Sequence, residues 1–187
     1  MKRVTRYLLA ALLVAACKDQ APEPVVVEVQ TLPPTQALVG QQVTAAVVAR
    51  RGQRGVSGIT INWTVESGAG TLSAPTSVTD ADGRAQITWT MGNAPTINAV
   101  VAAHEASQVR FQVITEADVA ANIVIVSGDA QSVVVGEEAR DSLVVRVVDR
   151  LGNPKGAATI TFQPRDGTVT STSAVTIGTG GQPCFRK

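Results

Sequence analysis

Apolar and polar residues alternate along several stretches of the chain after Val25. The stretch 59–66, ITINWTVE, places apolar side chains at every second position with polar ones between them, and 85–91 (AQITWTM) and 108–113 (QVRFQV) follow the same period. The side chains expected to face inward are Ile59, Ile61, Trp63 and Val65, then Ala85, Ile87, Trp89 and Met91, then Val109, Phe111 and Val113. This alternation predicts antiparallel strands with one face on a core and one in water.

Three further strands fit the stretches 25–30 (VVVEVQ), 42–50 (QVTAAVVAR) and 96–103 (TINAVVAA). Segments rich in Gly, Asp and Ser separate the strands at roughly even intervals, and no helical period is visible. Val, Ala, Thr and Gly dominate while aromatic residues make up only 3%, which also favours strands. About seven short strands in roughly ninety residues predict an all-β chain built from immunoglobulin-like β-sandwiches.

The chain repeats itself at a spacing of about 97 residues. The stretch VVARRGQRGVSGITINW returns as VVDRLGNPKGAATITF, GTLSAPTSVT returns as GTVTSTSAVT, and the Val39-Gly40 pair returns as Val135-Gly136. We therefore expect two tandem sandwiches, one over residues 25–116 and one over 121–187, joined by a short linker near EADVAA.

The repeated motifs resemble the first group of bacterial immunoglobulin-like domains, which are stacked in the stalks of invasin and intimin. The pattern Val-x-Asp-x-x-Gly-Asn-Pro-x-x-Gly before a strand ending in an aromatic residue is met by Val147, Asp149, Gly152, Asn153, Pro154, Gly156 and Phe162. Its continuation is met in the first copy by Gly70, Thr71, Leu72, Thr79, Asp80, Gly83, Ala85 and Trp89. The resemblance implies rigid spacer modules, and it carries over no receptor-binding residue.

Each copy departs from this pattern at one place. In the first copy RRGQRGVSG replaces the Asp and Asn-Pro, so we expect a changed turn between the same strands. In the second copy IGTGGQPCFRK, with Pro183 and Cys184, replaces the expected Asp-x-x-Gly-x-Ala. We expect the second sandwich to be incomplete, without its last two strands, and the sequence to be a fragment or a frameshifted gene product.

The N-terminal segment has the three parts of an export signal. Lys2, Arg3 and Arg6 precede an apolar run from Tyr7 to Ala16, which is too short to span a membrane because a helix of this length rises only about 15 Å. The run ends in VAAC, which resembles the bacterial lipoprotein signal. That resemblance implies removal of residues 1–16, cleavage between Ala16 and Cys17, and acylation of Cys17, which would anchor the chain to a membrane. The alternative is a plain secretory signal.

Residues 17–24 read as a lipidated cysteine followed by a Pro-rich tether, since Pro22 and Pro24 oppose helix formation and pairing inside a sheet. In lipoproteins of the enterobacterial type an Asp directly after the cysteine favours retention at the inner membrane. Lys18 occupies that place here, with Asp19 next. The sequence therefore favours the outer membrane or cell surface over the inner membrane.

Charge and cysteine content narrow the function classes further. The net charge is +1, and the mature chain has no basic block beyond ARRGQRG, which disfavours a nucleic-acid partner. The second cysteine is Cys184, so acylation of Cys17 leaves no pair for a disulfide within the mature chain. We expect packing alone to hold the sandwiches together.

Candidate chemical sites all have a structural explanation that we favour. His104 is expected in a solvated turn, and the Asp80, Asp82 and Gly83 turn falls short of the ligand set of a calcium loop. Trp63 and Trp89 are expected in the core rather than on a sugar-stacking platform. The cluster of Arg50, Arg51 and Arg54 is expected in a solvated loop, and GTGG near the end is a glycine turn. The sequence thus predicts no catalytic residue, no metal site and no cofactor.

These observations predict an envelope-anchored surface lipoprotein whose immunoglobulin-like modules act as a spacer or as a scaffold for adhesion, with a protein or glycan on a surface as its ligand. The alternative is a polysaccharide-binding or enzyme-accessory lipoprotein, in which a sandwich face or its end loops bind glycan. An enzyme is the third interpretation. The pattern carries no prediction of oligomeric state.

Overall fold

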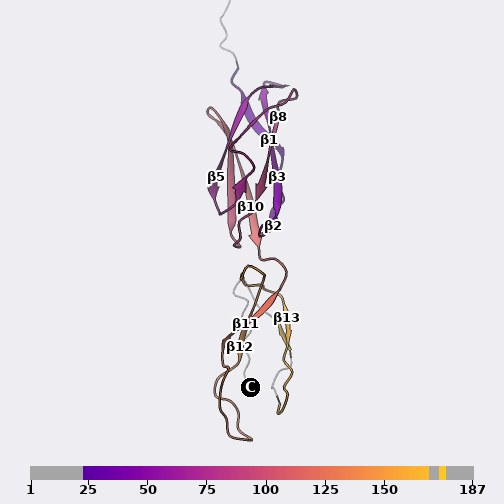
Figure 1. The fold of residues 1–187 in the computed structure, drawn as a ribbon. Helices are drawn as coiled ribbons and strands as arrows, with labels where there is room; N and C mark the ends of the chain where they lie inside the picture. Colours follow the sequence, from indigo (N-terminus) through magenta and orange to yellow (C-terminus); the bar gives the residue numbers. More distant parts are fainter. Residues whose placement is uncertain (1–22, 169–172, 176–187) are drawn as a thin grey trace, which may run out of the picture.

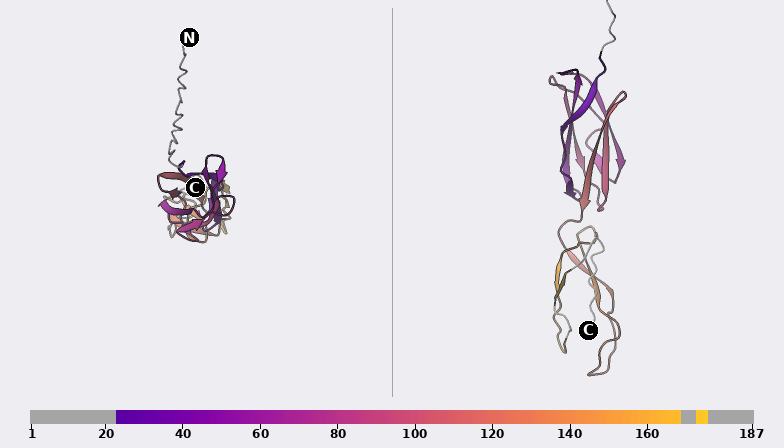
Figure 2. Two further views of the ribbon diagram at one scale, coloured as in Figure 1. Left: turned by 90° about the horizontal axis from the view of Figure 1, so that it is seen from above. Right: turned by 180° about the vertical axis from the view of Figure 1, so that it is seen from behind.

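The computed structural model describes residues 23–168 and 173–175. Within that part of the chain every regular element is a β-strand, which confirms the all-β prediction. The two repeats follow one another along the long axis of the molecule (Figures 1 and 2). In the described ranges no helix is long and apolar enough to cross a membrane.

The first repeat is a sandwich of two five-stranded sheets. One sheet has the order β1 (Val26–Thr31), β3 (Gln42–Arg51), β8 (Arg84–Thr90) and β6 (Thr71–Leu72), with β4 (Arg54–Gly55) paired to β3. The other has the order β2 (Gln36–Leu38), β10 (Ser107–Glu116), β9 (Ile97–His104), β5 (Thr60–Ser67) and β7 (Thr76–Val78). The three alternating stretches form antiparallel pairs, as predicted, and the short strand β2 runs parallel to β10.

The core of the first repeat lies between these sheets, where the alternation placed it. Ile61, Trp63, Ala85, Ile87, Trp89, Met91, Phe111 and Val113 are all buried, and Ile59, Val65 and Val109 pack against them. The rings of Trp63 and Phe111 stack with centroids 6.1 Å apart. Trp63 Nε1 donates a hydrogen bond of 2.8 Å to Ser77 Oγ, which satisfies its polar edge inside the core.

Strand β3 is buried on both of its faces over part of its length. Ala46 and Val48 face away from the core, yet both are buried. Val48 pairs with Glu28 on β1 and with Arg84 on β8, so longer side chains stand on either side of it. The arginine cluster is also more ordered than the predicted loop, since Arg50 and Arg51 lie in β3 and Arg54 in β4.

The described part of the second repeat contains two small sheets. Strand β11 (Asn122–Ser127) pairs with β12 (Val144–Val148), and β13 (Thr159–Thr161) pairs with β14 (Ser173–Val175). The β11–β12 pair is antiparallel and interrupted by a bulge, as is the β1–β3 pair. Val145, Val147 and Ile160 form a small core between β12 and β13, with Leu143, Ala158 and Phe162 packed against it.

The Val-Gly repeat seen in the sequence marks the same turn in both copies. Gly40 and Gly136 have φ values of 73° and 92°, a left-handed conformation that favours glycine. In each turn a backbone N–H donates to a carbonyl oxygen at 3.0 Å, from Gln41 to Leu38 and from Glu137 to Val134. The turns support the alignment of the copies at this point.

Several predicted features fall on residues outside the described ranges. They are the signal segment, Ala16 and Cys17, the glycine turn GTGG, and Pro183 and Cys184.

Candidate functional site at the joint between the two repeats

The repeats meet where residues 117–121 lead from β10 into β11, and the turn that follows β12 lies against this linker. The turn begins at Asp149, whose side chain is fully buried. Asp149 Oδ1 accepts hydrogen bonds from the backbone N–H groups of Leu151 at 2.8 Å and Asn153 at 2.9 Å. Asp149 Oδ2 accepts from Asn153 Nδ2 at 2.9 Å and from the backbone N–H of Asp118 at 3.1 Å. One carboxylate therefore binds its own turn and the linker together.

Two further side chains of the turn reach across the joint. Asn153 Nδ2 also donates to the carbonyl oxygen of Asn93 in the first repeat at 2.8 Å. Lys155 Nζ donates to the carbonyl oxygen of Ala117 in the linker at 2.7 Å. Arg150 and Asp118 form an ion pair of 3.2 Å, with the arginine largely exposed. These contacts hold the first repeat, the linker and the second repeat at one place.

The end of the first repeat is itself ordered by backbone hydrogen bonds. Val39 N–H donates to the carbonyl oxygen of Glu116 at 3.0 Å, and Gly40 N–H donates to that of Gly92 at 3.1 Å. A cavity of about 340 Å³ lies between this end and the second repeat. It is lined by Val39, Gly40, Asp118, Arg150 and Leu151.

Two opposing effects act on the pKa of Asp149. Burial alone would raise it, because a carboxylate loses its hydration there. The hydrogen bonds donated by the Asn153 side chain and by the backbone of Asn153, Leu151 and Asp118 stabilise the charged form and outweigh this effect. The pKa of Asp149 therefore lies below its ordinary value of 3.8. The buried group at the joint is an anion at neutral pH.

The turn at Asp149 has the same internal hydrogen bonds as the turn at Asp80. In the latter, Asp80 Oδ1 accepts from the N–H groups of Asp82 at 2.9 Å and Arg84 at 2.8 Å. In both turns the aspartate N–H donates to the carbonyl oxygen four residues later, and the glycine N–H donates back to the aspartate carbonyl. The calcium-like DADG stretch is thus a closed Asp-x-x-Gly-x turn. Asp149 differs because it is buried and its second oxygen bonds the linker.

Asp149, Gly152, Asn153 and Pro154 belong to the repeated family motif, and the motif alone predicted no function for them. The structure places them at the joint, with Gly152 at a φ of 85°. The registers of β1–β3 and β11–β12 match Val147 with Ala49, so Asp149, directly after β12, takes the place of Arg51. A buried aspartate directly after β12, two residues beyond the buried Val147, is the feature that distinguishes this turn.

The other predicted candidates lie apart from the joint. His104 is at the end of β9, with Nδ1 3.0 Å from the carbonyl oxygen of Thr60. Trp63 and Trp89 are buried in the core, so neither offers a stacking surface. Arg50 forms an ion pair of 3.2 Å with Glu28. Among the residues that the structure describes, no three His, Cys, Asp or Glu side chains are grouped to bind a metal.

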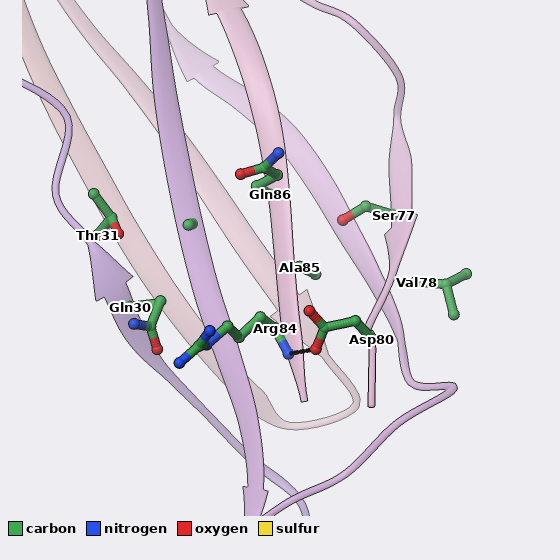
Figure 3. Close-up of a pocket in the computed structure, with 9 residues that line it drawn as sticks. Gln30, Thr31, Ser77, Val78, Asp80, Arg84, Ala85 and Gln86 are labelled. Carbon is green, nitrogen blue, oxygen red and sulfur yellow. Dashed lines mark hydrogen bonds between the residues drawn. The ribbon is translucent and has the colours of Figure 1, made fainter. Parts of the chain in front are cut away.

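A polar groove of about 530 Å³ lies over β1, β3 and β8 and extends to β7 of the other sheet. Figure 3 shows its lining residues, which are Gln30, Thr31, Ala46, Ser77, Val78, Asp80, Arg84, Ala85 and Gln86. The small side chain of Ala46 lies between Thr31 on β1 and Gln86 on β8, which leaves room above the sheet. The Arg84 side chain extends toward Gln30 in Figure 3. Amide, hydroxyl, guanidinium and carboxylate groups therefore surround one hollow.

No protein-family model and no curated protein matches the chain. Among solved structures it is similar to the D00-D0 domain of intimin, with 21% identity over 53% of this chain and 51% of that chain and a TM-score of 0.45. It is also similar to the D0-D1 domain of intimin, with 20% identity over 85% of this chain and 83% of that chain and a TM-score of 0.44.

The adhesin InvE of Yersinia pseudotuberculosis shares 18% identity over 50% of this chain and 32% of that chain, with a TM-score of 0.43. The chain thus spans about half of the first of these structures and about a third of the last. Intimin-type domains, which the sequence motifs predicted, are therefore among the folds that this chain is similar to. At these identities the likeness assigns no ligand and no activity.

Replacing Asp149 by alanine leaves the N–H groups of Leu151, Asn153 and Asp118 without their acceptor. We expect the change to lower the free energy of unfolding of the second repeat by about 1–3 kcal/mol, measured by urea denaturation. Asp129→Ala, at an exposed position, is the matched control and should change it by less than about 0.5 kcal/mol. Equal effects of the two substitutions would contradict the structural role of Asp149.

The difference in stability between the wild type and Asp149→Ala should depend on pH, and the pKa shift fixes the sign of that dependence. The pKa of Asp149 is lower in the folded than in the unfolded chain, so its contribution is fully present above the unfolded value, near 3.8. That contribution is lost as the pH falls through the folded pKa. The stability difference between the wild type and Asp149→Ala should therefore shrink in acid. A difference that grew on acidification would contradict this assignment.

Proposed function

We propose that this chain is an exported, non-catalytic envelope protein in which lipid-anchored immunoglobulin-like repeats hold an interaction surface away from the membrane. The observation that carries the proposal is the bonded joint. A flexible chain of domains needs no buried anion at its linker, whereas a spacer of defined reach requires the linker to be fixed. Asp149 and Lys155 each bond a backbone group of the linker, which suits the second purpose.

The positions of the two ends support the same function. The described part of the chain begins at residue 23, beside the hairpin of β3 and β4, where Glu23 lies close to Gly52. In Figure 1 this end is opposite the joint, so the second repeat lies on the far side of the first from the tether. A membrane anchor at Cys17 would then place the first repeat near the bilayer and the second repeat outward. We infer an outer-membrane or cell-surface location and a protein ligand on a neighbouring surface.

Anchoring has a direct chemical basis in the VAAC segment. Each buried CH₂ of an acyl chain contributes about 0.8 kcal/mol to membrane binding, and two or more chains give stable attachment. Acylation of the Cys17 sulfur, with cleavage after Ala16, would supply such chains at the start of the tether. The rest of the protein then needs no membrane-binding surface of its own.

Substituting Cys17 tests the anchor. In cells fed radiolabelled palmitate, we expect Cys17→Ser to reduce the label in the protein to background and to move the protein from the membrane to the soluble fraction. Cys184→Ser is the matched control and should keep both label and membrane binding. Equal labelling or equal membrane association of Cys17→Ser and the wild type would contradict the proposal.

The polar groove on the outer face of the first repeat favours a second candidate function, which is the binding of a neutral glycan. Gln30, Gln86 and Thr31 offer both donors and acceptors to sugar hydroxyls, and Arg84 and Asp80 offer one charge of each sign at one end. The groove holds no aromatic side chain, so hydrogen bonds rather than stacking would carry the recognition.

A glycan array probed with the purified chain tests this candidate. Any glycan bound through the groove should bind about tenfold more weakly to Gln86→Ala, because one or two hydrogen bonds of about 1 kcal/mol are lost. Gln108→Ala, an exposed amide on the other sheet, is the control and should bind as the wild type does. The absence of any bound glycan, or equal weakening by both substitutions, would remove the candidate.

A further inference from the structure

The two ends of the first repeat belong to segments that lie side by side. The chain enters β1 at Val26, crosses to the other sheet and continues as β2, while β10 ends at Glu116 and leads into the linker. Strand β1 begins at the end of the repeat opposite the joint, and β10 ends at the joint (Figure 1). Tension between the tether and the second repeat therefore pulls these neighbouring segments in opposite directions along their length.

Strand β2 is bonded to β10 at both of its ends. The N–H of Ile114 donates to the carbonyl oxygen of Thr35, just before β2, at 3.0 Å. The N–H of Val39, just after β2, donates to the carbonyl oxygen of Glu116 at 3.0 Å. Because the two strands are parallel and are pulled from opposite ends, the bonds between them are loaded in shear. They must then yield together, whereas bonds pulled apart from one end break one after another.

Strand β1 is also connected to β10 and to the core beside it. The N–H of Val27 on β1 donates to Ser107 Oγ, at the start of β10, at 2.8 Å. The side chains of Val27, Ala37 and Val39 are all buried. Sliding of β1 and β2 past β10 would thus break hydrogen bonds along the whole of β10 and pull three apolar side chains out of their packing.

The crossing between β1 and β2 is short and stiff. It consists of residues 32–35, Leu-Pro-Pro-Thr, and Pro33 within it is buried. The proline rings fix φ at two successive positions, so this segment has little slack to release when it is stretched. Tension that enters β1 therefore reaches β2 and its bonds to β10.

We propose that β1, β2 and β10 form a mechanical clamp, which keeps the first repeat folded while the second repeat is pulled away from the membrane. The inference rests on the proposed function, since tension arises only in a chain that is anchored at Cys17 and bound to something beyond the joint. Under force the unfolding rate decides how long a spacer keeps its length. The clamp lowers that rate for tension in this one direction.

Single-molecule stretching of the purified chain from Cys17 to Lys187 tests the clamp without disturbing it. One protein is held by the thiol of Cys17 and by Val119→Cys in the linker, with Cys184→Ser. A second is held by Gln42→Cys and Val119→Cys, both exposed positions at the joint end, with both natural cysteines replaced by serine. At the same constant force, the first repeat should unfold at least about tenfold more slowly in the first protein, because several hydrogen bonds must break together.

A matched pair of serine variants locates the clamp. Ser107 Oγ accepts a backbone N–H between β10 and β1, and Ser73 Oγ accepts the N–H of Thr88 between β6 and β8, away from the path of the tension. Ser107→Ala should speed unfolding about fivefold in the protein held at Cys17 and Val119→Cys, since one loaded hydrogen bond is lost. Ser73→Ala should leave that rate unchanged.

Either of two results would overturn the clamp. One is an unfolding rate that is the same in both pulling geometries, or faster between Cys17 and the linker. The other is equal acceleration by Ser107→Ala and Ser73→Ala, which would show a general loss of stability. Both measurements are made on the chain without acyl groups. Their failure therefore leaves the palmitate test of Cys17 intact, and failure of the palmitate test leaves these rates intact.

Discussion

The structure depends on one buried anion at the place where the two repeats meet. A linker of five residues joins the two sandwiches. If its backbone groups were hydrogen-bonded only to water, the repeats would be free to move relative to each other. Asp149 removes this freedom because its carboxylate accepts four N–H groups, one of them from the linker itself. Its charge is stabilised by those donors, and any loss of geometry leaves either the anion or the donors without partners.

The same type of Asp-x-x-Gly-x turn occurs twice in the described part of this chain, with a different structural role at each place. The Asp-x-x-Gly-x turn at Asp80 closes the connection from β7 to β8, while the turn at Asp149 closes the end of β12 and also bonds the linker. The first turn requires glycine at position 83. Its φ is 79°, and a Cβ at this position would lie only 2.5 Å from the carbonyl oxygen of Ala49. Burial and the second carboxylate oxygen distinguish the two, so a turn motif becomes a joint through its surroundings rather than its sequence.

Alternation predicted the core faces of the long strands because a period of two places every second side chain on the same side. It gave no sign of β2, β4, β6 and β7, which have two or three residues each and are held by neighbouring strands. It also missed Ala46 and Val48, whose burial comes from adjacent strands, and the buried Asn98, which donates to Thr115 Oγ1 at 3.1 Å. The joint was missed because Asn93, Asp118 and Asp149 are far apart in sequence and only folding brings them together.

The central claim is that Asp149 fixes the angle between the repeats. Electron spin-resonance distance measurements between labels at Gln112→Cys and Glu138→Cys, both exposed positions, test it in a chain whose own two cysteines are replaced by serine. The account predicts a single narrow distance distribution, retained in Asp129→Ala and clearly broadened in Asp149→Ala. A distribution that is equally broad with and without the Asp149 carboxylate would contradict it.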